Sequence, residues 1–181
     1  RPRNGLADWQ RILQDSDEFR RPRAVPVGQH HSHHAARERR AAPRDLGRRL
    51  ASHVRIGDVI ALEGGLGAGK TTLARGLLEG LGLEGEAPSP SFAIVQPYDI
   101  PDVRLPVAHV DLYRLDDAEE AAELALDEYL QDSLLIIEWP DRLGDGLWSH
   151  ALFLTIMIEP DGARRLTARV PDAWTDRWSQ I

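Results

Sequence analysis

The sequence of 181 residues contains no cysteine, which excludes disulfides, thiol catalysis and cysteine metal sites. No apolar run in it approaches the length of about 20 residues that is needed to span a bilayer. It also shows no apolar stretch of the kind found in a secretory signal. We therefore expect a soluble, cytoplasmic protein that does not involve a membrane. Lysine is nearly absent as well, because Lys70 is the only lysine among 22 basic residues.

The charges are divided unevenly along the chain. Residues 1–49 hold twelve arginines against six acidic residues, whereas residues 50–181 hold ten basic against twenty-three acidic residues. An acidic surface repels the phosphate backbone of nucleic acids. We therefore expect no direct, unaided binding of nucleic acid by residues 50–181, whereas docking on a partner protein is compatible with this charge.

Residues 1–42 are rich in Arg, His and Pro and lack a sustained apolar period. Such a composition buries too little apolar surface to offset the entropy of ordering, so we predict a flexible basic arm, with contact to RNA or an acidic partner as the alternative to plain disorder. Helical spacing of apolar residues marks one short helix at residues 6–13. The four histidines at residues 30–34 are interpreted as solvated, since a His-rich tract without partner carboxylates seldom holds a metal.

Residues 43–181 show the helix and strand patterns of one domain. The apolar period predicts helices over residues 45–54, 70–82 and 118–130, the last capped by Asp116 or Asp117. Four short apolar runs predict strands that helices cover on both faces, namely "VIAL", "FAIV", "PVAHV" and "LLII". Residues 151–170 alternate in two runs around a Pro-Asp-Gly turn and predict an antiparallel hairpin. A short helix is expected in residues 171–181.

One segment matches a phosphate-binding pattern in full. Gly64–Thr71 reads "GGLGAGKT", which satisfies G-x-x-x-x-G-K-[ST] between a predicted strand and a predicted helix. Its glycines let the backbone wrap phosphate oxygens, and the helix presents a positive N-terminus to the same anion. The alternative is a glycine-rich turn with an exposed lysine. We predict contacts to a nucleoside triphosphate from Gly65, Leu66, Gly67, Ala68, Gly69, Lys70, Thr71 and Thr72.

Lys70 and Thr71 have separate roles in such a loop. Lys70 reaches the β- and γ-phosphates as a slim ammonium, for which the planar fork of an arginine is a poor substitute. Thr71 places its hydroxyl on Mg²⁺. The predicted fold class is therefore a three-layer α/β fold of the P-loop NTPase type. It has a mostly parallel sheet, helices on both faces and a C-terminal antiparallel hairpin.

Two acidic residues follow predicted strands. Asp111 comes after "VAHV" and Glu138 after "LLII", so both are expected at the carboxyl edge of the sheet, where open parallel sheets bind their ligands. We predict that Thr71, Asp111 and Glu138 bind Mg²⁺, and that Lys70, Asp111 and Glu138 act in catalysis. The alternative is that each acid is an ordinary strand end facing water.

Five segments together resemble a known family. The segments "GGLGAGKTTLARG", "SPSFAIVQPY", "HVDLYRL", "LDEYL" and "IEWP" occur in this order within roughly residues 44–170. In order and separation they resemble the TsaE (YjeE) family, the P-loop ATPases of bacterial tRNA threonylcarbamoyladenosine synthesis. The resemblance implies an ATPase that acts with the proteins TsaD and TsaB, supports their turnover and meets tRNA only indirectly.

The resemblance also implies roles for single residues. Glu138 matches an acid linked to Mg²⁺ and hydrolysis, and Trp139 matches a residue near the nucleotide. Ser91 takes the place of a Thr that faces the γ-phosphate, so it keeps the hydroxyl and drops the methyl group. Arg164 or Arg165 matches a cation of the hairpin that approaches the base or phosphates, with surface exposure as the alternative.

Two other functions use the same loop. A small-molecule kinase would transfer the phosphate to an acceptor in a second pocket. A nucleotide-gated assembly module would bind partners in an ATP-dependent way without significant turnover.

Overall fold

The computed structural model describes residues 37–40, 42–144 and 148–181. The predicted helix at residues 6–13 and the histidine tract at residues 30–34 lie outside this part of the chain. Most of the arm expected at residues 1–42 is also outside it and stays a prediction. Its end is described, and Arg37–Arg40 forms a strand, β1.

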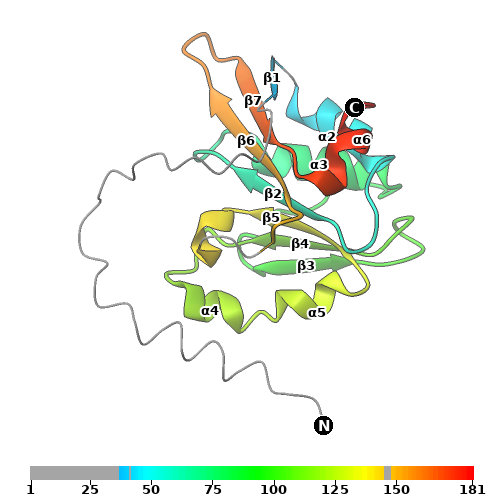
Figure 1. The fold of residues 1–181 in the computed structure, drawn as a ribbon. Helices are drawn as coiled ribbons and strands as arrows, with labels where there is room; N and C mark the ends of the chain where they lie inside the picture. Colours follow the sequence, from blue (N-terminus) through cyan, green and yellow to red (C-terminus); the bar gives the residue numbers. More distant parts are fainter. Residues whose placement is uncertain (1–36, 41, 145–147) are drawn as a thin grey trace. The chain divides into compact units, whose positions relative to one another are not determined.

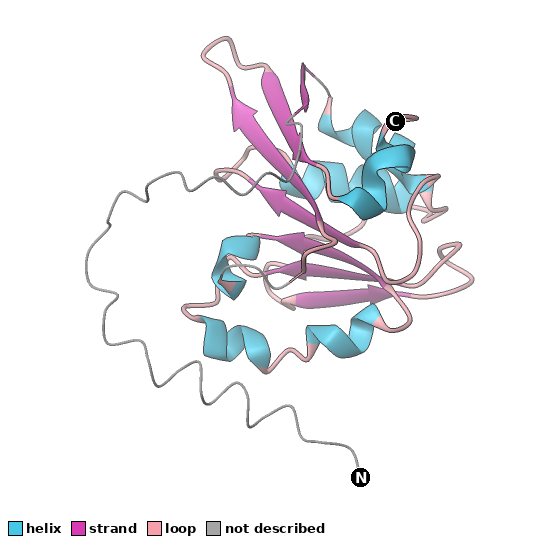
Figure 2. Cartoon of the chain, viewed as in Figure 1, coloured by secondary structure: helices cyan, strands magenta, loops and turns pink. Residues whose placement is uncertain are grey.

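The described strands form one sheet, in the order β1-β7-β6-β2-β5-β4-β3 (Figure 2). The strands after β1 are β2 (Val59–Glu63), β3 (Val95–Tyr98), β4 (Val107–Asp111), β5 (Leu134–Glu138), β6 (Leu152–Ile158) and β7 (Arg164–Arg169). The four central strands β4, β5, β2 and β6 run parallel to one another. Antiparallel pairs close both edges, with β3 beside β4 on one edge and β6, β7 and β1 on the other. The predicted parallel sheet and C-terminal hairpin are confirmed.

Helices cover both faces of this sheet (Figure 1). One face carries α2 (Pro43–Ala51), α3 (Lys70–Gly80) and α6 (Thr175–Trp178), and the other carries α4 (Ala118–Ala122) and α5 (Leu126–Leu130). Two 3₁₀ helices complete the elements, η1 (Pro140–Leu143) and η2 (Asp172–Trp174). Within the described ranges, no helix is long and apolar enough to cross a membrane.

The side chains of the central strands alternate between two separate hydrophobic cores, one on each face of the sheet. Successive side chains of a strand point to opposite faces, so Leu134 and Ile136 pack with α2 and α3, whereas Leu135 and Ile137 pack with α4 and α5. All four side chains are fully buried. This two-sided burial explains why the run reads as continuously apolar in the sequence.

The single helix expected over residues 118–130 is wrong, because α4 and α5 are separate. Ala125 adopts a left-handed backbone with φ of 49° and divides them, while Asp117 caps α4 as expected. In one continuous helix Ala121 and Leu126 would point about 140° apart. The break lets both side chains pack against the same face of the sheet, a tertiary requirement that outweighs helix propensity.

Helices α2 and α3 approach each other closely through glycine. A Cβ atom on Gly47 would lie 2.2 Å from the backbone oxygen of Leu73, and one on Gly76 would lie 2.1 Å from that of Arg44. Only glycine allows this approach. The first residue of α3 is Lys70, so the contact also fixes the direction from which the glycine-rich loop enters its helix.

Candidate nucleotide-binding site

The loop between β2 and α3 uses glycine where its backbone requires it. Gly64 and Gly69 have φ angles of 137° and 114°, a region that L side chains rarely adopt. At Gly64 a Cβ atom would also lie 2.3 Å from the backbone oxygen of Ile156. The loop therefore turns tightly over the end of β2 and leads directly into the N-terminus of α3.

Lys70 lies folded against its own loop. Its Nζ donates hydrogen bonds to the backbone oxygens of Gly64 at 2.7 Å and Gly65 at 3.0 Å, and it lies 3.7 Å from the ring centroid of Trp139. Burial lowers the pKa of Lys70, and the negative charges of Glu138 and of other nearby carboxylates partly offset this effect. The ammonium is thus a desolvated cation held beside the cavity.

Thr71 and Glu138 are directly joined. The hydroxyl of Thr71 donates to Oε2 of Glu138 at 2.9 Å, and Oε1 of Glu138 lies 2.9 Å from Nε2 of His109. Glu138 is the last residue of β5 and only 2% exposed. A nearly buried carboxylate with hydrogen bonds on both oxygens has a fixed orientation.

Asp111 lies beside Glu138 but has different partners. The two residues are register partners at the ends of β4 and β5. Asp111 accepts from the hydroxyl of Ser91 at 2.6 Å and from the backbone N–H of Tyr113 at 3.0 Å. Ser91 in turn lies 2.8 Å from the hydroxyl of Ser89. Asp111 therefore links the sheet edge to the loop before β3.

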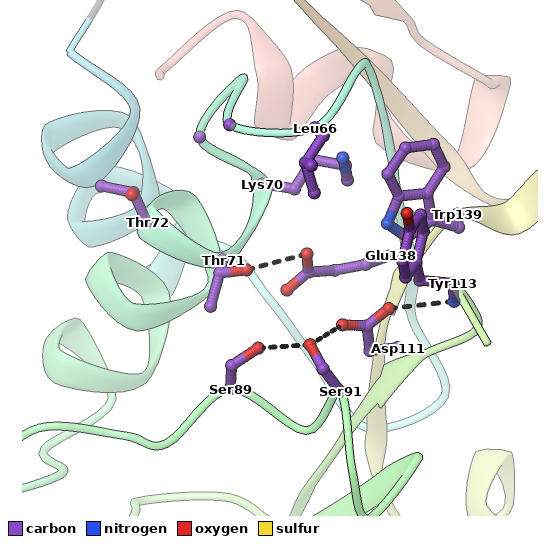
Figure 3. A pocket seen from close by; sticks show the side chains of 12 residues that line it. Leu66, Lys70, Thr71, Thr72, Ser89, Ser91, Asp111, Tyr113, Glu138 and Trp139 are labelled. Atoms are coloured by element: carbon purple, nitrogen blue, oxygen red, sulfur yellow. Dashed lines mark hydrogen bonds between the residues drawn. The ribbon is translucent and has the colours of Figure 1, made fainter.

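These side chains surround a cavity of about 280 Å³ (Figure 3). The lining residues that the sequence predicts are Leu66, Gly67, Gly69, Lys70, Thr71, Thr72, Ser91, Asp111, Glu138 and Trp139. The predicted residues Gly65, Ala68 and Arg164 do not line it. Arg164 instead donates from Nε to the backbone oxygen of Ala68 at 3.2 Å, so it holds the loop rather than facing the cavity.

Sequence reasoning missed three residues of this site. Ser89 and Tyr113 line the cavity, and the ring of Tyr113 lies 5.1 Å from that of Trp139. His109 lies behind Glu138 and was not singled out. The signal for His109 was strand periodicity, because a residue two positions before Asp111 on the same strand points to the same face.

The comparison with protein families decides the identity of the chain. Residues 37–166 match the family model "Threonylcarbamoyl adenosine biosynthesis protein TsaE". The chain belongs to the TsaE family. The resemblance seen in the sequence is thereby confirmed, and it extends from β1 into β7.

Curated TsaE proteins are similar over most of their own length. The tRNA threonylcarbamoyladenosine biosynthesis protein TsaE of Streptomyces coelicolor is 46% identical over 114 residues, which cover 62% of this chain and 77% of that protein. The protein of the same name from Bacillus subtilis is 39% identical over 118 residues, covering 65% and 72%.

A solved structure supports the fold class. The crystal structure of Bacillus subtilis YdiB superposes with a TM-score of 0.67 at 29% identity, covering 81% of this chain and 93% of that chain. The predicted α/β fold with a mostly parallel sheet is therefore confirmed by a similar protein as well as by the strand order.

The oxygen atoms at the cavity fit Mg²⁺. The described residues contain no cluster of three or more His, Asp or Glu side chains that would form a metal site of protein ligands alone. Mg²⁺ does not need one, since it usually takes one or two carboxylates and completes its shell with water and substrate phosphates. Thr71, Asp111 and Glu138 supply hard oxygen donors of that kind around one cavity.

Proposed function

We propose that this chain binds ATP with Mg²⁺ and hydrolyses it in tRNA threonylcarbamoyladenosine biosynthesis. One observation carries the proposal most directly. Lys70 and Thr71 at the start of α3 meet Asp111 and Glu138 from two neighbouring strands around a single cavity. A phosphate-binding loop, a hydroxyl for the metal and two carboxylates are the parts that phosphoryl transfer by P-loop NTPases requires.

The loop and Lys70 hold the phosphates. The N-terminus of α3 carries a partial positive charge and unpaired backbone N–H groups, which favour an anion. Lys70 exchanges its bonds to the oxygens of Gly64 and Gly65 for the β- and γ-phosphates. The ring of Trp139 stays beside the ammonium and keeps water away from it.

The proposed roles in holding the metal and in orienting the attacking water fall to different residues among Thr71, Asp111 and Glu138. Because Thr71 donates its hydroxyl hydrogen to Glu138, the lone pairs of its oxygen remain free for Mg²⁺. Bound Mg²⁺ neutralises charge on the phosphates. Asp111 holds the hydroxyl of Ser91 at the same cavity, so these two residues orient the attacking water, and Asp111 contributes the second carboxylate near the metal.

The family and the charge both support the proposed partners. We propose TsaD and TsaB as the proteins that this ATPase serves, with tRNA contacted only indirectly and the work done in the cytoplasm. The acidic charge of residues 50–181 supports this division, since an acidic surface repels RNA and leaves the role of binding it to the partners. Hydrolysis is expected to be slow until the partners are added.

The first test is Lys70→Ala, with Arg49→Ala as a control that removes an exposed cation of α2. We expect Lys70→Ala to weaken ATP binding by about 30-fold or more, since removing one partner of a buried charged contact costs about 2–5 kcal/mol. Isothermal calorimetry measures the affinity, and Arg49→Ala should bind like the wild type. Wild-type affinity and phosphate release by Lys70→Ala would contradict the proposal.

A second measurement separates the remaining functions. Products are followed with the wild-type chain alone and with TsaD and TsaB added. A rise in free phosphate on mixing supports a partner-stimulated ATPase. ATP-dependent association without phosphate release supports an assembly module, and a phosphorylated small molecule identifies a kinase.

A further inference from the structure

His109 is a buried polar side chain that the proposed chemistry does not use. It lies in the middle of β4, is fully buried, and does not line the cavity. Its Nε2 lies 2.9 Å from Oε1 of Glu138, and its Nδ1 has no hydrogen-bond partner. A buried polar group of this kind costs free energy, so a compensating role is expected.

The strand register brings His109 behind Glu138. Residues 107, 109 and 111 of β4 point to the face of the sheet that carries α3, as do Ile136 and Glu138 of β5. Ile136 is the register partner of His109 and is fully buried. The imidazole therefore lies beside a buried apolar residue, and the carboxylate of Glu138 lies between the ring and the cavity.

The hydrogen atom of the imidazole can be assigned from its surroundings. With the hydrogen on Nε2, the ring donates to Oε1 of Glu138 and only the lone pair of Nδ1 stays unpaired. With the hydrogen on Nδ1, a donor would be buried without a partner, and buried donors are rarely left unpaired. His109 is therefore a donor to Glu138.

The two oxygens of Glu138 consequently have separate tasks. His109 occupies Oε1 from behind, and Thr71 donates to Oε2 from the cavity side. The terminal torsion of a glutamate is broad and has no sharp preference of its own. A donor on one oxygen is thus what aims the other oxygen at the hydroxyl of Thr71.

We propose that His109 is a positioning residue for Glu138, holding the carboxylate so that Thr71 presents its oxygen lone pairs to Mg²⁺. The inference rests on the proposed function, because it concerns the metal side of the same site. It assigns His109 no contact with nucleotide or metal. Its effect is therefore confined to the part of ATP affinity that depends on Mg²⁺.

The variants are His109→Phe, which keeps a ring and removes the donor, and His109→Gln, which keeps a donor near the position of Nε2. ATP affinity is measured in Mg²⁺ and in EDTA. For His109→Phe we expect the ratio of the two affinities to fall by about 10-fold or more, as for other residues that orient metal ligands, with affinity in EDTA unchanged within about twofold. His109→Gln should restore most of the ratio.

A purely structural role predicts another pattern. Loss of packing would weaken ATP binding equally in Mg²⁺ and in EDTA, and His109→Gln would not rescue it. That result, or a wild-type ratio in His109→Phe, overturns the proposal.

A measurement on the wild-type chain without nucleotide tests the hydrogen bond itself. Nitrogen-15 NMR of the histidine side chains should show a slowly exchanging hydrogen on Nε2 of His109, whose signal shifts or disappears in Glu138→Ala. A hydrogen on Nδ1 instead, or a signal indifferent to Glu138→Ala, overturns the proposal even where a His109 variant does not fold. If the wild type binds no ATP at all, the proposed function fails, and this signal still reports on the pair.

Discussion

Asp111 and Glu138 are neighbours with the same chemistry and different surroundings. Both end a parallel strand and both are nearly buried, at 4% and 2% exposure. Glu138 shares its carboxylate between Thr71 and His109, whereas Asp111 is shared between Ser91 and the backbone of Tyr113. At the scale of single residues, hydrogen-bond partners therefore distinguish the acid that is bonded to the start of α3 from the acid that is bonded to the loop before β3.

This difference predicts unequal effects of neutralising the two acids. Glu138→Gln should reduce the Mg²⁺-dependent part of ATP affinity more than Asp111→Asn does, by about 10-fold or more, because only Glu138 is bonded to the hydroxyl of Thr71. Calorimetry at several Mg²⁺ concentrations measures it, with Glu123→Gln as an exposed control. A larger loss of Mg²⁺-dependent affinity in Asp111→Asn than in Glu138→Gln would contradict the proposal that Glu138 is the acid on the metal side.

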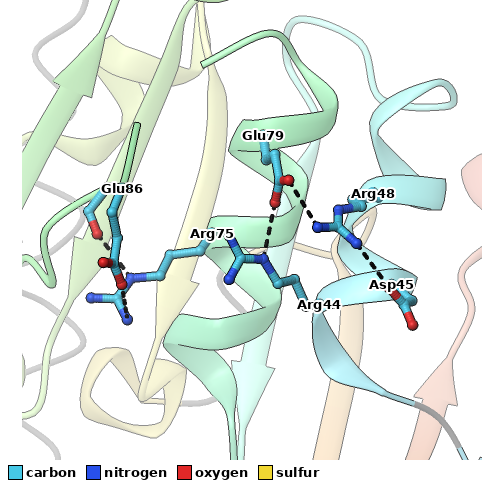
Figure 4. A network of polar contacts seen from close by, with 7 residues as sticks. Arg44, Asp45, Arg48, Arg75, Glu79 and Glu86 are labelled. Carbon is cyan, nitrogen blue, oxygen red and sulfur yellow. Dashed lines mark hydrogen bonds and ion pairs between the residues drawn. The ribbon is translucent and has the colours of Figure 1, made fainter. Parts of the chain in front are cut away.

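At the scale of elements, the position of α3 depends on its packing with α2. Gly47 and Gly76 bring the two backbones into contact, and salt bridges cross the outside of the pair (Figure 4). Glu79 of α3 accepts from Nε of Arg44 at 3.0 Å and from a terminal nitrogen of Arg48 at 2.8 Å. The two helices are therefore held by close backbone packing on their buried side and by salt bridges on their exposed side.

Gly76→Ala should destabilise the fold. The new Cβ would lie 2.1 Å from the backbone oxygen of Arg44, which no side-chain rearrangement relieves. We expect a loss at or above the upper end of the about 1–3 kcal/mol that overpacking costs, measured as the free energy of unfolding in urea. Gly65→Ala is the matched control, because its Cβ would meet no atom within 4 Å. Equal stability of the two variants would show that α2 moves away freely.

The salt bridges of Glu79 predict a dependence of stability on pH. Hydrogen bonds from Arg48 and then Arg44 lower the pKa of Glu79 below its ordinary value of 4.5. A carboxylate whose pKa is lower in the folded state than in the unfolded state stabilises the fold at pH values above its unfolded-state pKa. This contribution to stability is lost as the pH falls through the folded-state pKa. Glu79→Gln should therefore be slightly less stable than the wild type at about pH 7, and the difference should shrink as the pH falls below 4.5 and Glu79 takes up a proton. A pH-independent difference in thermal unfolding would contradict this account.

At the scale of the whole described domain, the end of the chain closes one face of the sheet. Trp174 is fully buried, and Trp178 and Ile181 pack into the same core. Arg177 reaches back to Asp58, with nitrogen–oxygen distances of 2.5 and 3.0 Å. Asp58 directly precedes β2, so this ion pair joins α6 to the strand that leads into the glycine-rich loop.

Arg177→Met should cost stability well beyond a surface effect. It keeps the aliphatic stem and leaves the carboxylate of Asp58 buried without its cation. Removing one partner of a buried ion pair costs about 3–5 kcal/mol, and the residual exposure of both side chains places the expectation at the lower end. Arg49→Met on the exposed side of α2 is the control, and urea unfolding of both variants gives the comparison. A loss no greater than that of Arg49→Met would mean that the pair contributes little.

Part of this molecule could be predicted because its signals are local. The glycine pattern before Lys70 predicts the turn directly, because the positive φ angles of that loop require glycine at those positions. Asp111 and Glu138 could be placed at one edge because the ends of parallel strands meet there. The division of α4 from α5 could not be predicted, because burial of Ala121 and Leu126 on one face depends on a sheet distant in sequence.

The sequence alone determined the glycine-rich loop, the alternation of strands and helices, and the family. These features depend on residue types at short spacings, which a single chain displays directly. Only the tertiary structure decided that Arg164 holds the loop and that His109 stands behind Glu138. Both contacts join residues far apart in the chain, 96 positions for Arg164 and Ala68 and 29 for His109 and Glu138, so strand pairing had to bring them together first.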